Sequence, residues 1–225
     1  MNLGIGQPRW IATLALAASC LTGAPAAAQP QPAMNRAQAL AALDKPQAEQ
    51  RAAGVARLAE IGTMPDTERL ARRLDDDDER VRELADLALW QIWGRSGDRT
   101  IDALFQRGVD QMQAGELDAA LVTFTDIVRR KPAFAEGWNK RATILFLLGQ
   151  HEASLADCRK VLERNRLHYG ALSGMGQIYL HLGDLEQALR HFQRALQVNP
   201  HLPGALEAVR LLQQHLQPPG SRLTT

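Results

Sequence analysis

The sequence has little of what commonly identifies a catalytic or nucleic-acid-binding protein. Aromatic residues make up 5% of it, and 26 basic side chains against 25 acidic ones leave a formal net charge of +1. This balance favours neither nucleic acid nor anionic lipid as a partner, because both need an excess of positive charge on one face. No Walker loop, H-E-x-x-H motif or nucleophile elbow occurs. We therefore expect a protein that is not an enzyme.

Patterns that bind cofactors and metals are equally scarce. The aspartate run Asp75–Asp78 lacks the spaced ligands and the glycine of a calcium loop, so we expect it to cap a helix instead. No two histidines lie four residues apart, which argues against zinc or haem on a helix. The six histidines are His151, His168, His181, His191, His201 and His215. We expect no cofactor and no metal site.

The first 28 residues have the pattern of a secretory signal peptide. Arg9 is the only charged residue among them, and the apolar stretch Trp10–Leu21 is shorter than the roughly 20 residues that a membrane-spanning helix needs. The run Ala26-Ala27-Ala28 gives the small-x-small pattern of a cleavage site. We expect cleavage after Ala28, export to the periplasm or to the medium, and no membrane insertion of the processed chain.

A lipoprotein is the alternative for this segment. Leu16-Ala17-Ala18-Ser19-Cys20 is similar to a lipobox in which the aliphatic residue lies one position too far from the cysteine. In that case Cys20 carries a lipid and anchors the chain to a membrane. Otherwise Cys158 is the one cysteine left, an internal disulfide is impossible, and we expect this thiol to be a buried core residue. Residues 29–34 are proline-rich and predict a flexible tether.

Strand signals are missing, and helix signals begin directly after the tether. Residues 35–98 predict a helix over 36–43 capped by Asn35, a second over 46–61 closed by Gly62, a third over 65–74 and a fourth over 80–93 closed by Gly94. The segment Leu74–Arg82, with the small and aliphatic residues after it, resembles the HEAT-type helical repeat. That resemblance implies stacked helix pairs and no particular chemistry.

Self-similarity with a period of 34 residues dominates the second half of the chain. Residues 101–134, 135–168 and 169–202 align without a gap. Small residues let paired helices approach closely, larger ones fill the space between hairpins, and one glycine position suits the left-handed turn that ends a first helix. The aligned sets are Leu104, Trp138 and Leu172; Gly108, Ala142 and Gly176; Gly115, Gly149 and Gly183; Ala120, Ser154 and Ala188; Phe124, Cys158 and Phe192; and Ile127, Val161 and Ala195.

These units resemble the tetratricopeptide repeat, whose signature is W-x2-L-G-x2-Y, then A-x3-F, then P. The third unit matches best, with Leu172-x2-Met175-Gly176-x2-Tyr179, Ala188-x3-Phe192 and Pro200. The first keeps Gly108, Ala120-x3-Phe124 and Pro132, whereas the second has Ser154, Cys158 and Arg166 at the later signature positions. The resemblance implies an all-α, right-handed α-solenoid of three antiparallel helix hairpins that binds other proteins.

Two further segments belong to this architecture. Residues 203–216 predict a helix that caps the last hairpin, so the repeat domain spans residues 101–216, and the tail 217–225 is expected to be disordered. Trp90 and Trp93 end an apolar helix and are expected to pack against the first hairpin, joining both halves into one continuous solenoid. The alternative is an exposed tryptophan pair that binds a partner.

The resemblance also implies a concave groove lined by the first helix of each hairpin. Its apolar side chains are expected to anchor a peptide, and its amides and hydroxyls to bond the peptide backbone. In the alternative interpretation, Phe105 and Phe146 only fill the solenoid or cover the N-terminal helices. The groove residues are Phe105, Val109, Met112, Asn139, Thr143, Phe146, Ser173, Gln177 and Leu180.

The expected ligand is a largely uncharged, apolar segment of another protein. Tetratricopeptide domains that grip a C-terminal carboxylate use lysine, arginine and asparagine at set groove positions, and Phe105, Val109, Gly170 and Gly174 occupy most of these here. We expect a periplasmic adaptor of a bacterium with two membranes. One alternative is a self-assembling structural protein, that is, a homo-oligomer joined through Trp90 and Trp93. The other is an accessory subunit of an envelope enzyme or assembly complex.

Overall fold

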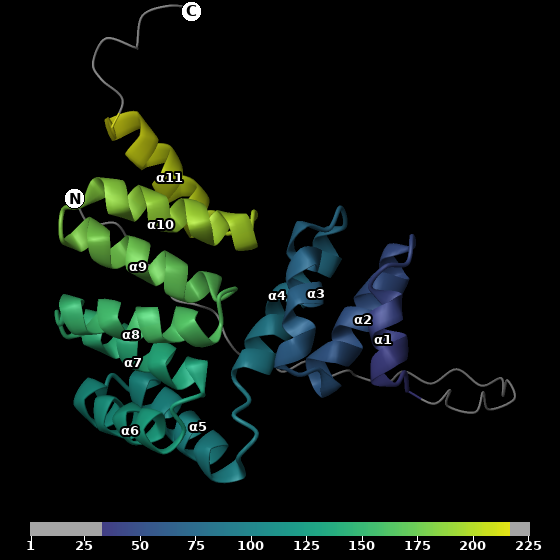
Figure 1. Ribbon diagram of the computed structural model, residues 1–225, viewed down its shortest axis with the longest axis horizontal. Coiled ribbons are helices and arrows are strands. Elements are labelled where there is room, and N and C mark those ends of the chain that lie inside the picture. Colours follow the sequence, from purple (N-terminus) through teal and green to yellow (C-terminus); the bar gives the residue numbers. More distant parts are fainter. Residues whose placement is uncertain (1–32, 217–225) are drawn as a thin grey trace, which may run out of the picture. The chain divides into compact units, whose positions relative to one another are not determined.

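The computed structural model describes residues 33–216, and every regular element within them is a helix (Figure 1). The predicted all-α class is confirmed. The signal segment, most of the tether and the tail lie outside the described residues. No described helix has both the length and the apolar character needed to cross a membrane. The α-helices are α1 (Arg36–Ala42), α2 (Ala48–Ile61), α3 (Thr67–Ala71), α4 (Glu79–Trp93), α5 (Arg99–Gln113), α6 (Leu117–Arg130), α7 (Ala135–Leu147), α8 (His151–Arg164), α9 (Tyr169–His181), α10 (Leu185–Val198) and α11 (Pro203–Leu216).

The helices α1 and α2 form a closely packed pair. Asn35 caps α1 by accepting a hydrogen bond from the backbone N–H of Gln38, as expected. A Cβ on Gly54 would lie 2.7 Å from the carbonyl oxygen of Ala39, so the two backbones nearly touch there. Gly62 closes α2, but its φ of −68° is not left-handed. Glycine is needed at 62 for space, because a Cβ would lie 2.4 Å from the carbonyl oxygen of Leu58.

The segment between α2 and α4 is less regular than the single predicted helix over 65–74. It consists of α3 between two short 3-10 turns, η1 (Met64–Asp66) and η2 (Arg72–Asp75). The aspartate run acts as a helix cap, because Asp78 accepts from the backbone N–H of Val81 at 3.1 Å. The buried Asp76 pairs with Arg51 through two hydrogen bonds of 2.6 and 2.8 Å. Between residues 33 and 216, no three potential metal-ligating side chains come together. Membership of the HEAT family stays a prediction for residues 35–98.

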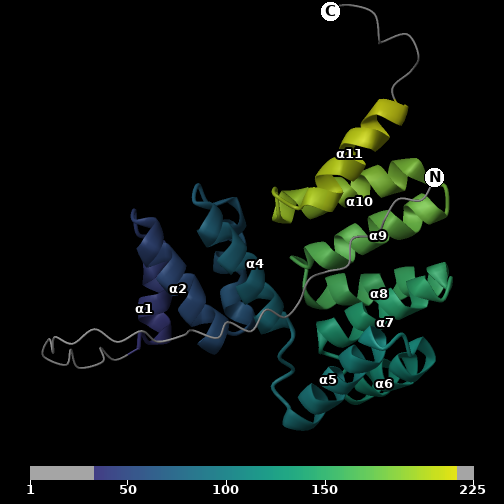
Figure 2. The same ribbon diagram turned by 180° about the vertical axis from the view of Figure 1, so that it is seen from behind.

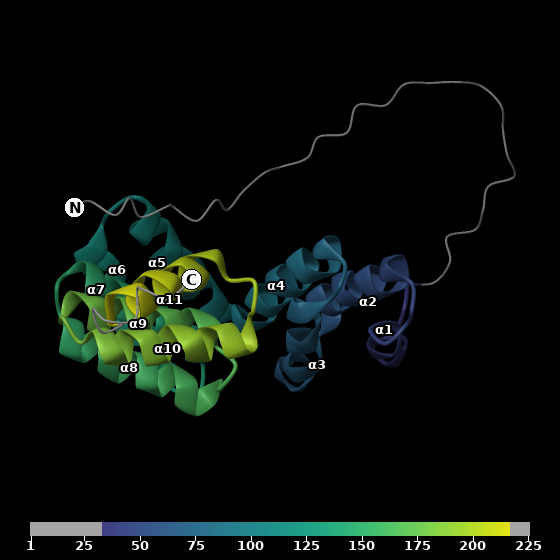
Figure 3. The same cartoon turned by 90° about the horizontal axis from the view of Figure 1, so that it is seen from above.

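The six helices α5 to α10 form three hairpins stacked in chain order, with α11 packed on α10 (Figures 1 and 2). Figure 3 shows the same stack from above. The turn inside each hairpin contains a glycine in the left-handed region, with φ of +76° at Gly115, +74° at Gly149 and +77° at Gly183. This is the conformation that the repeat pattern requires of glycine.

The second hairpin keeps the fold despite its departures from the signature. The hydroxyl of Ser154 donates to the carbonyl oxygen of Ala142 at 2.7 Å, so the polar side chain is satisfied inside the hairpin. Cys158 is buried as expected, and burial raises the pKa of its thiol to about 12. Asn165 accepts a hydrogen bond from the backbone N–H of Leu167 at 3.2 Å and stabilises the turn in which Arg166 replaces proline.

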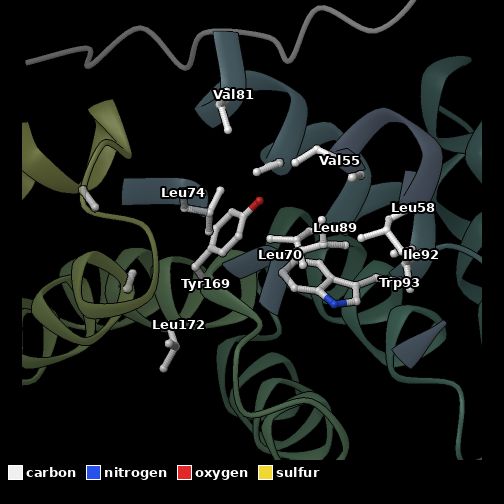
Figure 4. Close-up of a cluster of buried hydrophobic side chains, with 14 of the residues drawn as sticks. Val55, Leu58, Leu70, Leu74, Val81, Leu89, Ile92, Trp93, Tyr169 and Leu172 are labelled. Carbon is white, nitrogen blue, oxygen red and sulfur yellow. The ribbon is translucent and has the colours of Figure 1, made fainter. Parts of the chain in front are cut away.

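The hydrophobic core connects segments that are far apart in sequence. One cluster contains Leu89, Ile92 and Trp93 of α4 together with Tyr169 and Leu172 of α9 (Figure 4). The first hairpin has a separate cluster around Phe124 and Phe134. The expectation that the tryptophans pack against the first hairpin is therefore wrong, because α4 meets the start of the third hairpin instead.

Candidate protein-binding site

The nine predicted groove residues lie three each on α5, α7 and α9, the first helices of successive hairpins. Thr143 and Gln177 are exposed and Asn139 is buried. The other six are half-buried, namely Phe105, Val109, Met112, Phe146, Ser173 and Leu180. The two exposed members of the predicted site are therefore on α7 and α9, whereas all three members on α5 are half-buried.

The two phenylalanines serve packing inside the stack. Phe105 meets Phe124 and Phe134 edge-on, with ring centroids 5.7 and 5.4 Å apart. Phe146 meets His181 edge-on at 4.8 Å and lies beside the cluster that contains Cys158. Both side chains are therefore at least partly structural, as the alternative interpretation of the sequence holds.

Asn139 does not have its amide free for a peptide backbone. It is buried, and its Nδ2 donates to both carboxylate oxygens of Glu136 at 3.1 and 3.2 Å. The hydroxyl of Thr143 donates to the carbonyl oxygen of Asn139 at 3.0 Å. Among the predicted polar contacts, Ser173, Gln177 and the acceptor lone pairs of Thr143 remain.

A buried polar cluster links α7 to the start of α9. Nε2 of His168 lies 2.8 Å from a carboxylate oxygen of Glu136, and Nζ of Lys140 lies 3.2 Å from the other. Nδ1 of His168 accepts from the backbone N–H of Ala171 at 3.0 Å, so we assign the ring proton to Nε2. Burial opposes the charge on Glu136, but Lys140, His168 and Asn139 outweigh it and lower its pKa to about 2.

Two tryptophans of α4 cover this cluster. Trp93 is 3% exposed and stacks on His168 with ring centroids 4.7 Å apart. Trp90 meets His168 and Tyr169 edge-on at 5.3 and 5.6 Å, and Nζ of Lys140 lies 5.9 Å from its ring centroid. The predicted alternative of an exposed tryptophan pair is thus wrong for Trp93, and Trp90 is half-buried.

Asp86, which lies one helical turn before Trp90, adds a polar contact between α4 and the start of α9. The hydroxyl of Tyr169 donates to its carboxylate, and Nδ2 of Asn199 lies 3.4 Å from the same oxygen. Burial raises the pKa of Asp86, and the hydrogen bond from Tyr169 opposes that rise in part. We call this contact area the α4 dock. It consists of Asp86, Trp90 and Trp93 of α4 and of the residues on which they pack, namely Lys140, His168, Tyr169 and Gly170.

Sequence reasoning missed most of the α4 dock. In the 34-residue alignment, His168 aligns with the apolar residues Phe134 and Leu202. A polar residue at a position that is apolar in the other units could have indicated a buried histidine. Asp86 lies among the apolar residues of α4 in the same way. The sequence spacing does not predict which residues His168 and Asp86 contact, because those residues lie on other helices.

The hairpin geometry agrees with family comparisons. Residues 105–166 and residues 169–202 each match a family model described as tetratricopeptide repeat. The chain carries a tetratricopeptide-repeat domain. A TPR repeat-containing protein of Rhizobium etli is 35% identical over 124 residues, which are 55% of this chain and 61% of that protein. The chain thus spans less than two thirds of the length of this relative.

Solved structures resemble the tetratricopeptide-repeat domain as well. The first TPR of Spaghetti (RPAP3), bound to an HSP90 peptide, has a TM-score of 0.50 and 25% identity over 52% of this chain and 92% of that chain. The Yersinia enterocolitica type III secretion chaperone SycD, in complex with a peptide of the translocator YopD, has a TM-score of 0.51 over 53% of this chain and 97% of that chain. At 12% identity, the second likeness shows the fold alone.

Proposed function

We propose that the protein is an exported scaffold that binds a peptide segment of another protein on the faces of α7 and α9. One observation carries this proposal: α7 and α9 expose the polar side chains of Thr143 and Gln177 beside half-buried residues, namely Phe146, Ser173 and Leu180. An apolar surface with a few hydrogen-bonding groups suits an extended or helical segment. The HSP90 peptide in the similar Spaghetti domain supports a peptide as the ligand class.

The affinity of this surface is expected to be modest. Burying one large apolar side chain contributes about 1.5 to 3 kcal/mol, while association costs at least about 4 kcal/mol. Two or three anchored side chains therefore give a reversible complex. Export is the second part of the proposal, and the signal-peptide pattern of residues 1–28 supports it.

Photo-crosslinking in cells tests the binding surface. A photo-reactive amino acid at position 143 or 177 is expected to capture a discrete partner protein. Positions 153 and 197 are matched controls, because Ala153 and Gln197 are exposed on α8 and α10, the second helices of the same two hairpins. Glutamate substitution of Phe105 or Phe146 is avoided, since both side chains pack inside the stack.

Two outcomes would contradict the proposed surface: equal capture from all four positions, or capture from 153 and 197 alone. Cell fractionation of the same strain tests export, and a protein retained in the cytoplasm would contradict that part. The identity of the captured protein decides between a free adaptor and an accessory subunit of an envelope complex.

A further inference from the structure

Two histidines from neighbouring hairpins lie beside each other. His181 is the last residue of α9, and His151 is the first residue of α8. Their ring centroids are 5.7 Å apart, and the ring planes are inclined by 51°. Spacing within a single helix does not relate the two residues, because they are on different helices. The pair is therefore a product of the tertiary fold.

The distance between the two rings suits the ligands of a single metal ion. An imidazole nitrogen binds Zn²⁺ at about 2.0 to 2.1 Å, so two imidazoles on one tetrahedral ion have ring centroids about 5 to 6 Å apart. The observed 5.7 Å lies within this range. The two helices therefore already hold the rings at a spacing at which both can reach one cation.

His181 has the orientation that is common among metal-binding histidines. Its Nδ1 lies 3.0 Å from the carbonyl oxygen of Gln177. A carbonyl only accepts hydrogen bonds, so we assign the ring proton to Nδ1, which leaves the lone pair of Nε2 free. Histidines that bind metal almost always donate their other ring N–H to a carboxylate, a backbone carbonyl or water.

His151 has a ring nitrogen without a partner. Its Nδ1 is buried and makes no hydrogen bond among residues 33–216. A buried polar atom without a partner costs free energy. The aligned residues of the other two hairpins are Leu117 and Leu185, so an apolar side chain serves this position without that cost. A cation bound to Nδ1 would satisfy the lone pair of this nitrogen.

An aromatic side chain borders the histidine pair. The ring centroid of Phe146 is 4.8 Å from that of His181 and 5.5 Å from that of His151. Phe146 is half-buried and carries no charge. Apolar surroundings limit the access of water and strengthen the attraction between a cation and its ligands. Packing of the three rings on one another is the competing explanation, and it predicts no affinity for metal.

We propose that His151 and His181 form a binding site for one divalent transition-metal ion of the zinc class, bound by Nδ1 of His151 and Nε2 of His181 with water in the other positions. Imidazole nitrogen suits Zn²⁺, Ni²⁺ and Cu²⁺, whereas Mg²⁺ and Ca²⁺ prefer oxygen ligands. No third histidine, cysteine or carboxylate joins the pair between residues 33 and 216, so the metal is expected to exchange readily. The site does not rest on the proposed peptide-binding function.

Calorimetric titration of the full chain with zinc chloride at neutral pH measures the site. His151→Leu introduces the residue type of the other two hairpins and is expected to keep the fold, and His181→Ala changes an exposed side chain. Each variant is expected to lower the zinc affinity at least about tenfold, because losing only an outer partner of a ligand costs about 10- to 100-fold. His215→Ala is the matched control, since His215 is exposed on α11. Magnesium chloride is the negative probe.

Thermal unfolding is the second measurement. A ligand that binds only the folded chain stabilises it, so zinc is expected to raise the Tm of the wild type but not that of His151→Leu or His181→Ala. A wild type that does not bind zinc would overturn the proposal, as would equal zinc affinity in the wild type and both variants. An equal loss in His215→Ala would also overturn it, because binding would then not be confined to this pair. Photo-crosslinking from positions 143 and 177 is carried out without added zinc, so the two proposals fail separately.

Discussion

Glu136 is a buried carboxylate with three partners, and its charge is tied to the folded state. Its pKa falls from an ordinary 4.5 to about 2, so the folded chain binds a proton there less readily than the unfolded chain. Protonation therefore favours unfolding. The stabilisation from this group is complete above about pH 4.5 and is lost as the pH falls towards 2.

Urea unfolding of the full chain between pH 6 and pH 2.5 measures this linkage. The wild type is expected to lose stability more steeply with falling pH than Glu136→Gln, and the two curves should converge at the acid end. Glu152→Gln is the control, because Glu152 is exposed on α8. Parallel wild-type and Glu136→Gln curves would show that Glu136 has an ordinary pKa.

At the scale of elements, the left-handed backbone conformation after each first helix is what requires glycine there. Gly149 has a φ of +74°, and an added Cβ would meet nothing within 4 Å, so conformation and not space excludes other residues. Gly149→Ala is expected to destabilise the chain by about 1 to 2 kcal/mol. Gly149→Asn should cost less, because asparagine tolerates the left-handed region. Thermal unfolding measures both, and equal losses in the two variants would contradict this account.

The same elements show how much of the fold could be predicted. A period of 34 residues identifies the hairpins, their glycine turns and the buried positions of Phe124, Cys158 and Phe192, because each contact recurs between neighbouring helices. The segment after Gly62 was predicted less well. Its short turns have no periodic pattern, and the single helix expected over 65–74 is divided into three pieces.

For the whole molecule, the α4 dock is the feature that no periodicity predicts. Tyr169 and Asp86 are 83 positions apart in the chain, and no repeat pattern relates them. The predicted groove residues lie on α5, α7 and α9, the first helices of the hairpins, but Asn139 bonds to Glu136 and Phe105 packs on Phe134. The sequence specifies which helix a side chain lies on, whereas its neighbours depend on tertiary packing.

Hydrogen exchange of the variant with Trp90→Ala and Trp93→Ala tests this coupling between distant segments. Replacing a buried tryptophan with alanine costs about 3 to 5 kcal/mol, so amides of α4 and of the start of α9 are expected to exchange faster than in the wild type. The first hairpin has its own core around Phe124 and is the internal control. Faster exchange spread evenly over all helices would indicate general unfolding instead.

The α4 dock also constrains how the array can change length. Repeat arrays commonly grow by duplication of a unit, because each unit contacts only its neighbours. Here α4 precedes the first hairpin in the chain but rests on Lys140 of the second and Gly170 of the third. A duplicated unit inserted before α7 would place an extra hairpin between α4 and the α7 and α9 residues that it contacts, whereas a unit added after Leu202 would leave these contacts, including that of Asn199 with Asp86, in place. The array is therefore open to extension at its carboxyl-terminal end and restricted at its amino-terminal end.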